Sequence, residues 1–132
     1  MGRKRLNITI SSCPGFAEDS HSLSVLHRVF TTEEKRMLFG LVFRDSELNR
    51  VDFSHANLSE TEFHRTSLIG ADFSGADLRG TSFYGCDLRG ARFDHAAIRH
   101  TRFDGSWLLG VRGLSEYLLE YVRRRGGLLW AS

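Results

Sequence analysis

The sequence predicts an all-β solenoid, a chain wound into stacked coils, and two observations carry this prediction. A large apolar residue recurs at every fifth position, with a mostly small residue two positions before it. From Phe43 onward, phenylalanine alternates strictly with leucine or isoleucine. A period of five fits neither the α-helix, with about 3.6 residues per turn, nor the two-residue alternation of a β-strand. Such a fixed period is typical of a solenoid. The large residues are Phe43, Leu48, Phe53, Leu58, Phe63, Leu68, Phe73, Leu78, Phe83, Leu88, Phe93, Ile98, Phe103 and Leu108.

The alternation also predicts how many sides each coil has. If one coil takes twenty residues, Phe43 and Phe63 stack in one column, and Phe53 and Phe73 stack in the opposite column. Stacked positions would lie about 4.8 Å apart, the usual spacing between neighbouring strands. A three-sided coil would instead stack Phe on Leu in every column. The alternation therefore favours an even number of sides, with Phe on two opposite ones.

Several five-residue units resemble a known repeat. Residues 56–60 read ANLSE, residues 71–75 read ADFSG, residues 76–80 read ADLRG and residues 86–90 read CDLRG. A small residue, then Asp or Asn, then Leu or Phe, then two variable residues resembles the pattern of the pentapeptide-repeat family. The resemblance covers residues 41–110. It implies a right-handed quadrilateral parallel β-helix with four repeats per coil, and hence about 3.5 coils.

The two flanks leave this period, and we expect them to cap the coils within a single domain. Residues 1–40 are the N-terminal cap, residues 41–110 the β-helix, and residues 111–132 a C-terminal helix and tail. Covers are needed because end coils expose unpaired backbone groups and core. The N-terminal cap is expected to be of mixed structure, with a strand at residues 6–10 and a short helix from the capping box at residues 31–34 through Leu38.

The C-terminal flank predicts a helix that is capped by Ser115 and runs to about Arg125. Gly126 and Gly127 end it, and an apolar tail follows. Two interpretations stay open for this segment. Helix and tail fold over the last coil, or they form the interface of a homodimer, since exposed Trp and Leu clusters often mark partner surfaces. The residues of this cap or dimer surface are Leu118, Leu119, Tyr121, Val122, Leu128, Leu129 and Trp130.

No residue pattern in the sequence predicts catalysis, a cofactor or a metal site. Asp and Asn at the second repeat position, such as Asp52 and Asn57, are expected to face outward and bond to nearby backbone. His55 and His95 stand two coils apart, too far to share a zinc ion with ligand distances of about 2 Å. Glycines at the fifth position are expected at corners with positive φ and not in a phosphate-binding loop. We therefore predict that the protein is not an enzyme.

The distribution of charged residues helps to choose among the non-catalytic functions. Residues 41–110 hold ten acidic and eight arginine side chains, whereas each flank has two excess positive charges. Because arginines alternate with aspartates, we expect a solvated surface of mixed charge and no nucleic-acid partner. Outward apolar residues gather in the column of Arg89, which indicates a patch that the terminal helix covers or a partner binds. The candidate partner surface comprises Ile69, Arg79, Arg89, Arg99, Trp107 and Leu109.

These features predict a non-catalytic scaffold that presents a rigid side to a protein partner. One alternative follows from the resemblance, because quinolone-resistance members of the family imitate DNA and bind gyrase, protecting it from inhibitors. A second alternative is an arginine-rich surface that binds nucleic acid or another anionic surface. The chain has no apolar run of about eighteen residues, so no membrane span is expected. Two isolated cysteines make no disulfide framework, which favours the cytoplasm.

Overall fold

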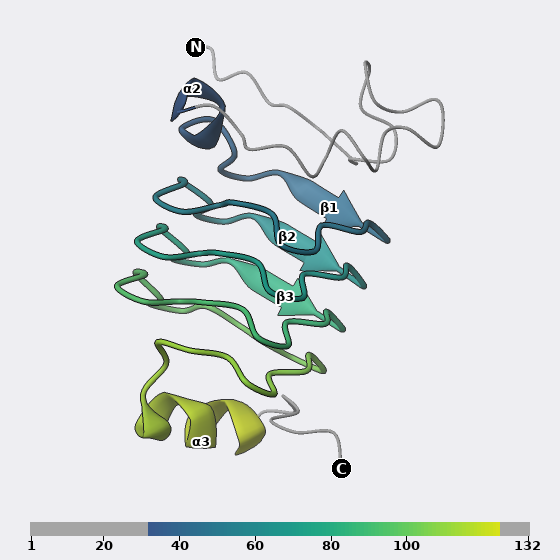
Figure 1. Cartoon of the computed structure of the whole chain (residues 1–132), viewed down its shortest axis with the longest axis vertical. Helices are drawn as coiled ribbons and strands as arrows, with labels where there is room; N and C mark the ends of the chain where they lie inside the picture. Colours follow the sequence, from purple (N-terminus) through teal and green to yellow (C-terminus); the bar gives the residue numbers. More distant parts are fainter. Residues whose placement is uncertain (1–31, 125–132) are drawn as a thin grey trace.

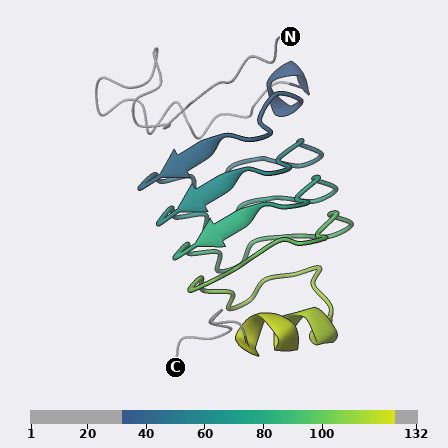
Figure 2. The same ribbon diagram turned by 180° about the vertical axis from the view of Figure 1, so that it is seen from behind.

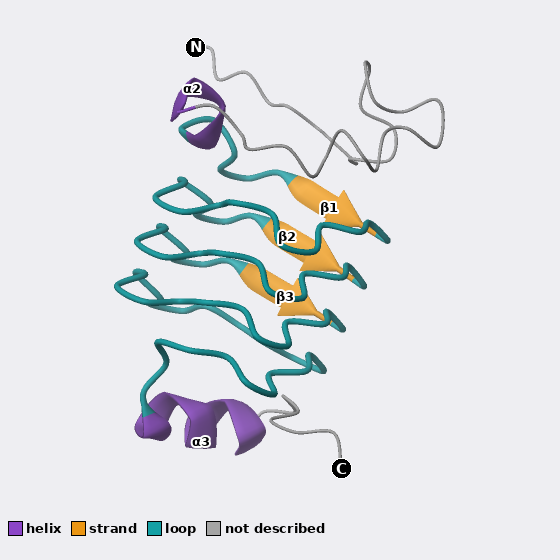
Figure 3. Cartoon of the chain, viewed as in Figure 1, coloured by secondary structure: helices purple, strands orange, loops and turns teal. Residues whose placement is uncertain are grey.

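The computed structural model describes residues 32–124 of the chain. They form a stack of similar coils, with helix α2 (Thr32–Lys35) at one end and helix α3 (Glu116–Arg124) across the other (Figure 1). Strands β1 (Val42–Arg44), β2 (Glu62–His64) and β3 (Ser82–Tyr84) lie next to one another along one side of the stack (Figure 3). The strand predicted at residues 6–10 and the apolar tail lie outside the described residues.

Residues twenty positions apart lie one above the other in neighbouring coils. The parallel sheet pairs Phe43 with Phe63 and Phe63 with Phe83. On the other sides the backbone makes single parallel bridges with the same spacing, for example from Asp52 to Asp72. Because each side takes five residues, one coil has four sides. The prediction of a β-helix solenoid is confirmed.

The interior contains two columns of phenylalanine rings that face each other. Within a column the rings are nearly parallel, with centroids 5.1 Å apart for Phe63 and Phe83 and also for Phe73 and Phe93. Rings of opposite columns meet edge to face, at 5.5 Å for Phe73 and Phe83. Such aromatic pairs contribute about 0.5–1.5 kcal/mol beyond the burial of their surface. The sequence correctly predicts Phe on two opposite sides.

The small residues fill the rest of the interior, and most of those with a hydroxyl or thiol bond to carbonyl groups of the preceding coil. Thr81 Oγ1 donates to the Leu58 carbonyl oxygen at 2.7 Å. Cys86 Sγ takes the same position and lies 3.2 Å from the Phe63 carbonyl oxygen. Within residues 32–124, no buried side-chain nitrogen or oxygen lacks a hydrogen-bond partner. Satisfied polar groups are what a buried position requires.

Each five-residue side ends in a corner where the backbone has a positive φ. Gly75 has a φ of +68° and Gly80 of +73°, as the sequence predicts for glycine at this position. At most corners an amide closes a turn, as when the Thr81 N–H donates to the Leu78 carbonyl at 3.0 Å. This bond and the positive φ match a type II turn. Seven corners of the described coils hold no glycine, however, among them His55 with a φ of +60°.

Helix α2 is shorter than predicted. It ends at Lys35 and not at Leu38, because the residues after it already belong to the coils. The Lys35 carbonyl accepts a hydrogen bond from the Asn57 N–H at 2.8 Å, and the Gly40 N–H donates to the Ser59 carbonyl at 2.9 Å. Leu38 is buried in the core. The geometry of the repeats therefore begins before residue 41.

Helix α3 begins where the sequence predicts and lies across the end of the stack (Figure 2). Ser115 Oγ accepts a hydrogen bond from the Leu118 N–H at 3.1 Å, as an N-cap residue does. Val122 is buried against the core, and Leu118 packs partly on it. Tyr121, which the sequence assigns to the cap or dimer surface, is 48% exposed. Leu114, Leu118 and Val122, which are spaced four residues apart, pack against the coil, and Tyr121 lies beside this row.

Candidate functional site

Side chains at the second and fourth position of each repeat form the outer surface. Residues twenty apart share a row on this surface, because the backbone pairs in that register. Asp72 Oδ1 accepts the Ser74 N–H at 2.9 Å, and Asp52 Oδ1 accepts the Ser54 N–H at 2.9 Å. This is the local backbone bonding predicted for the Asp and Asn series. These residues therefore stabilise the sides of the coil.

Four surface arginines of the later repeats each pair with an aspartate two residues away. Arg79 and Arg89 each donate two side-chain hydrogen bonds to Asp77 and Asp87, with the shorter bonds at 2.6 and 2.7 Å. These hydrogen bonds lower the pKa of Asp77 and that of Asp87. On the other two sides the order is reversed, and an arginine at the second position pairs with an aspartate at the fourth. The surface therefore carries neutral pairs.

The six residues of the predicted partner surface do not form one surface. Ile69, Arg89 and Leu109 share one row, and Trp107 lies in the row beside them, paired with Asp87 of the preceding coil. Arg79 and Arg99 share a row that is ten residues, or half a coil, away. In a coil with four sides, half a coil means the opposite side. The predicted surface therefore separates into two groups.

The first group keeps large apolar side chains in contact with solvent. Trp107 is 37% and Leu109 is 43% exposed. We call Ile69, Arg89, Trp107 and Leu109 the Trp107 patch. Helix α3 does not bury it, because Trp107 and Leu109 stay exposed and the groove beside this helix is lined by other coil residues, among them Ile98, His100 and Phe103. Of the two uses predicted for the patch, covering by α3 is therefore wrong for the described part of this helix.

The second group has a different character. Arg79 and Arg99 line a shallow hollow together with Glu60 and His100. A carboxylate in the same hollow opposes the arginine charge, and Arg79 already pairs with its aspartate. This side therefore presents a mixed set of charges.

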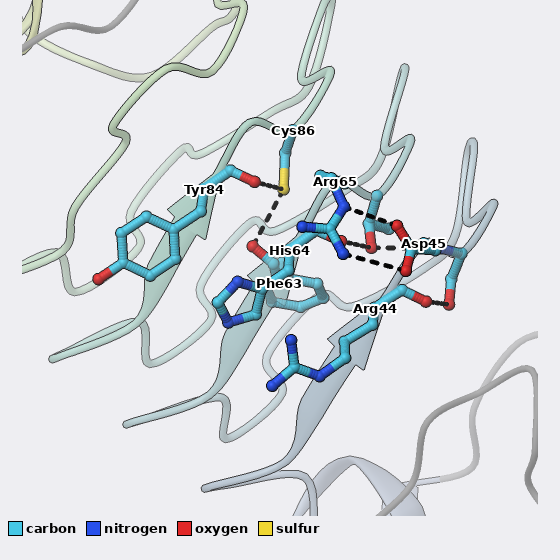
Figure 4. Close-up of polar contacts among 9 residues, drawn as sticks. Arg44, Asp45, Phe63, His64, Arg65, Tyr84 and Cys86 are labelled. Carbon is cyan, nitrogen blue, oxygen red and sulfur yellow. Dashed lines mark hydrogen bonds and ion pairs between the residues drawn. The ribbon is translucent and has the colours of Figure 1, made fainter.

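The sequence analysis does not predict one cluster of side chains on the surface. The His64 and Tyr84 rings stack with centroids 5.0 Å apart, on the side that carries the three strands (Figure 4). Arg102 lies 5.9 Å from the centroid of the Tyr84 ring, and Glu62 lies 2.8 Å from His64 Nε2. The signal was present in the sequence, because His64 and Tyr84 stand twenty positions apart.

Cys86 has no reactive character. Its Sγ points between the Phe63 and Tyr84 carbonyl oxygens, at 3.2 and 3.6 Å (Figure 4). Burial raises the pKa of the Cys86 thiol to about 11. Because the thiolate is the nucleophile, such a thiol is a poor one at neutral pH.

No metal site is found in the part of the chain that the structure describes. No group of three or more His, Cys, Asp or Glu side chains comes close enough there to hold an ion. The His55 ring lies over the Gly75 corner, where an added Cβ would come within 2.6 Å of its Cε1. His55 therefore packs on the coil next to it.

Comparison with known proteins agrees with the geometry. The sequence model described as Pentapeptide repeats matches eight copies, over residues 46–83 and 71–108. These residues belong to the pentapeptide-repeat family. The match to the family model supports the right-handed β-helix that the repeats imply, and scaffolds of this kind are generally not catalytic. None of the curated proteins matches the chain.

Three solved proteins are similar to part of this chain. A pentapeptide repeat protein from the Arabidopsis thaliana thylakoid lumen is 25% identical, with 69% of this chain and 70% of that chain covered and a TM-score of 0.36. QnrB1, a plasmid-mediated fluoroquinolone resistance protein, is 17% identical, with coverages of 65% and 63% and a TM-score of 0.42. A protein from the cyanobacterium Cyanothece 51142 is 23% identical, with coverages of 52% and 56% and a TM-score of 0.30.

Proposed function

We propose that this chain is a non-catalytic scaffold that binds a protein partner through the Trp107 patch. The observation that carries this proposal is the exposure of Trp107 and Leu109 next to Arg89 on a side that no described element covers. Trp and Arg are enriched among the residues that dominate binding energy at interfaces. Backbone hydrogen bonds to the preceding coil, such as the one from the Trp107 N–H to the Cys86 carbonyl at 2.9 Å, hold the patch in place, so little conformational freedom is lost on binding.

Affinity capture from the source cells tests this proposal. The variant Trp107→Ser with Leu109→Ser removes the apolar part of the patch, and Arg79→Ser with Arg99→Ser alters the opposite side by the same number of residues. We expect the wild type and the Arg79/Arg99 variant to retain the same protein, and the Trp107/Leu109 variant to lose it. With the purified partner, affinity should fall at least about tenfold, which corresponds to about 1.4 kcal/mol. Equal retention by all three proteins would contradict the proposal.

We further propose about 3.5 coils, closed by residues 1–40 and 111–132, in a cytoplasmic protein. Cys86 is a free thiol, which suits a reducing compartment. Neither helix within residues 32–124 has the length and apolar character to cross a membrane.

Binding to gyrase as a DNA mimic receives no support from the surface charges. Duplex DNA carries one charge about every 1.7 Å, so a mimic needs a continuous acidic side. In residues 32–124, the row that begins with Asp52 and Asp72 continues with Arg92 and Arg112. A supercoiling assay with a gyrase inhibitor, run beside the capture experiment, decides between the two functions. Protection of gyrase that survives the loss of the Trp107 patch would favour the mimic.

A further inference from the structure

The last coil leaves one of its columns open at the end of the stack, on the side formed by residues 96–100. Ile98 ends this column and is partly exposed, whereas Leu78 in the coil before it is fully buried. Phe103 and Leu108 end two other columns and are only 3% and 2% exposed. Of these three columns, only that of Ile98 is therefore incompletely covered.

The backbone of the same side lacks the partners that every earlier coil provides. One coil before, the Leu78 N–H donates to the Ala97 carbonyl oxygen at 2.8 Å. The equivalent N–H of Ile98 has no backbone partner within residues 32–124. The residue that stands twenty positions after Ala97 is Tyr117, and it belongs to helix α3 instead of a further coil. The chain thus leaves the repeat at the point where the next side would pair.

Two more backbone groups on this side are left in the same way. In the coil before, the Gly80 N–H and the Ala76 carbonyl bond to the following coil at 3.0 and 2.9 Å. Their equivalents, the His100 N–H and the Ala96 carbonyl, have no such partner in the part of the chain that the structure describes. Residues 96–100 therefore present two donors and one acceptor in the register by which the coils pair. Unpaired groups at a strand edge are a template for another strand.

This edge forms one wall of a groove, and helix α3 forms the other. Ile98 and His100 line the groove on the coil, and Tyr117 and Leu118 line it on the helix. Its volume is about 460 Å³. Binding sites commonly have volumes of about 300–1,000 Å³. An extended peptide can bond to such an edge through its main chain, while alternate side chains enter pockets and give specificity.

We propose that residues 96–100 bind an extended segment of a protein partner, which adds one parallel strand to the last coil. The register of the coils determines which side chains fit. The partner residue beside Ile98 points into the stack, so it should be large and apolar, as Leu78 is. The next partner residue lies beside Arg99, which is exposed and forms no ion pair within residues 32–124. An acidic residue there would pair with this arginine.

The partner segment therefore contains a large apolar residue followed directly by an acidic one. This site is half a coil away from the Trp107 patch, on the opposite side of the stack. The two proposals are therefore independent, and the protein can bind two partners at once.

Hydrogen exchange in the full-length protein tests whether the edge is open. We expect the amide protons of Ile98 and His100 to exchange at least about tenfold faster than those of Leu78 and Gly80, measured by NMR. Equal protection of the two pairs would mean that the edge is already occupied and would overturn the proposal. Protection that appears only at high protein concentration would overturn it in favour of a second copy of the chain.

Selection from a library of displayed random heptapeptides then identifies a ligand for the full-length protein. We expect the bound sequences to share an apolar residue followed by an acidic one. N-methylation of the residue before the apolar one removes the donor to the Ala96 carbonyl and should weaken binding at least about fivefold. N-methylation of the apolar residue itself is the matched control, because the equivalent N–H in the coils points away from the preceding coil. Equal effects of the two methylations would overturn the strand geometry.

Three variants complete the test. Arg99→Glu should weaken binding of the selected peptide at least about threefold. Arg112→Glu changes an arginine that is also exposed, on another side of the coil, and should have no effect. Trp107→Ser with Leu109→Ser should bind the peptide like the wild type, even where it loses the partner of the Trp107 patch. A selection that yields no peptide dependent on Arg99 overturns the proposal.

Discussion

The corners of the first and second complete coils have the same backbone conformation but different residues. The first coil has Arg50, His55, Glu60 and Arg65 at its corners, with φ between +49° and +62°. The second has Gly70, Gly75, Gly80 and Gly85, with φ between +62° and +73°. A positive φ costs an ordinary L-residue about 1–2 kcal/mol, yet the first coil accepts it four times.

The difference shows that these glycines provide space as well as conformational freedom. The side chain of each first-coil corner lies over the glycine twenty residues later. A Cβ added at Gly75 would lie 2.5 Å from His55 Nδ1, and one added at Gly80 would lie 2.6 Å from Glu60 Oε2. At Gly90, by contrast, an added Cβ would meet nothing within 4 Å. At Gly75 and Gly80, a side chain of the preceding coil therefore occupies the space that a Cβ would need.

Gly75→Ala should break this arrangement most strongly. The new methyl group meets the rigid His55 ring, so overpacking of about 1–3 kcal/mol adds to the backbone strain of about 1–2 kcal/mol. We expect a loss of about 2–4 kcal/mol in the free energy of unfolding, measured by urea denaturation. Gly90→Ala is the control, since it carries the strain without the contact. Equal losses in the two variants would show that space plays no part.

The double variant His55→Gly with Gly75→Ala sharpens the same comparison. Removing the ring frees the space that the methyl group needs, so part of the loss should be recovered. In a double-mutant cycle we expect a coupling of about 1–2 kcal/mol between the two positions. His55→Gly combined with Gly90→Ala is the matched pair and should be additive.

Gly80→Ala should have a smaller effect than Gly75→Ala. The atoms in its way belong to the carboxylate of Glu60, the far end of a flexible side chain that can turn into solvent. The expected loss is about 1–2 kcal/mol, close to that of Gly90→Ala, because mainly the backbone strain remains. A loss as large as that of Gly75→Ala would mean that Glu60 is held in place.

The smallest expected effect concerns the aspartate–arginine pairs on the sides of the coil and the stability of the protein in acid. Hydrogen bonds from Arg79 and Arg89 lower the pKa of Asp77 and of Asp87 in the folded state. Their stabilisation is therefore complete above the unfolded pKa of about 3.9 and is lost as the pH falls through the lower folded values. Asp77→Asn with Asp87→Asn should flatten the pH dependence of urea unfolding below about pH 4, with a change of about 1 kcal/mol or less. If the pH dependence below about pH 4 is the same in the variant and the wild type, Asp77 and Asp87 do not contribute to acid stability in this way.

The interior was predictable because its residues recur at a regular spacing along the sequence. The spacing of Phe43, Phe63 and Phe83 alone indicates which rings stack, and Ser115 marks the start of α3. The surface was less predictable, because exposure depends on what lies nearby in three dimensions. That Arg79 and Arg89 lie on opposite sides follows from their separation of half a coil, but the openness of the Trp107 patch depends on the path of α3. The end of α2 was not predictable, because there the backbone bonds to the next coil instead of continuing the helix.

Because residues twenty apart pair in neighbouring coils, the residue number within one row gives the position along the axis of the stack. Moving a side chain by twenty positions keeps its side and direction and shifts it by about 4.8 Å along the stack. Glu47, Ser67, Asp87 and Trp107 form one such row. A series of proteins with tryptophan at one of these four positions and serine at the others would act as a ruler. The position that binds most tightly would show at which height a partner makes contact.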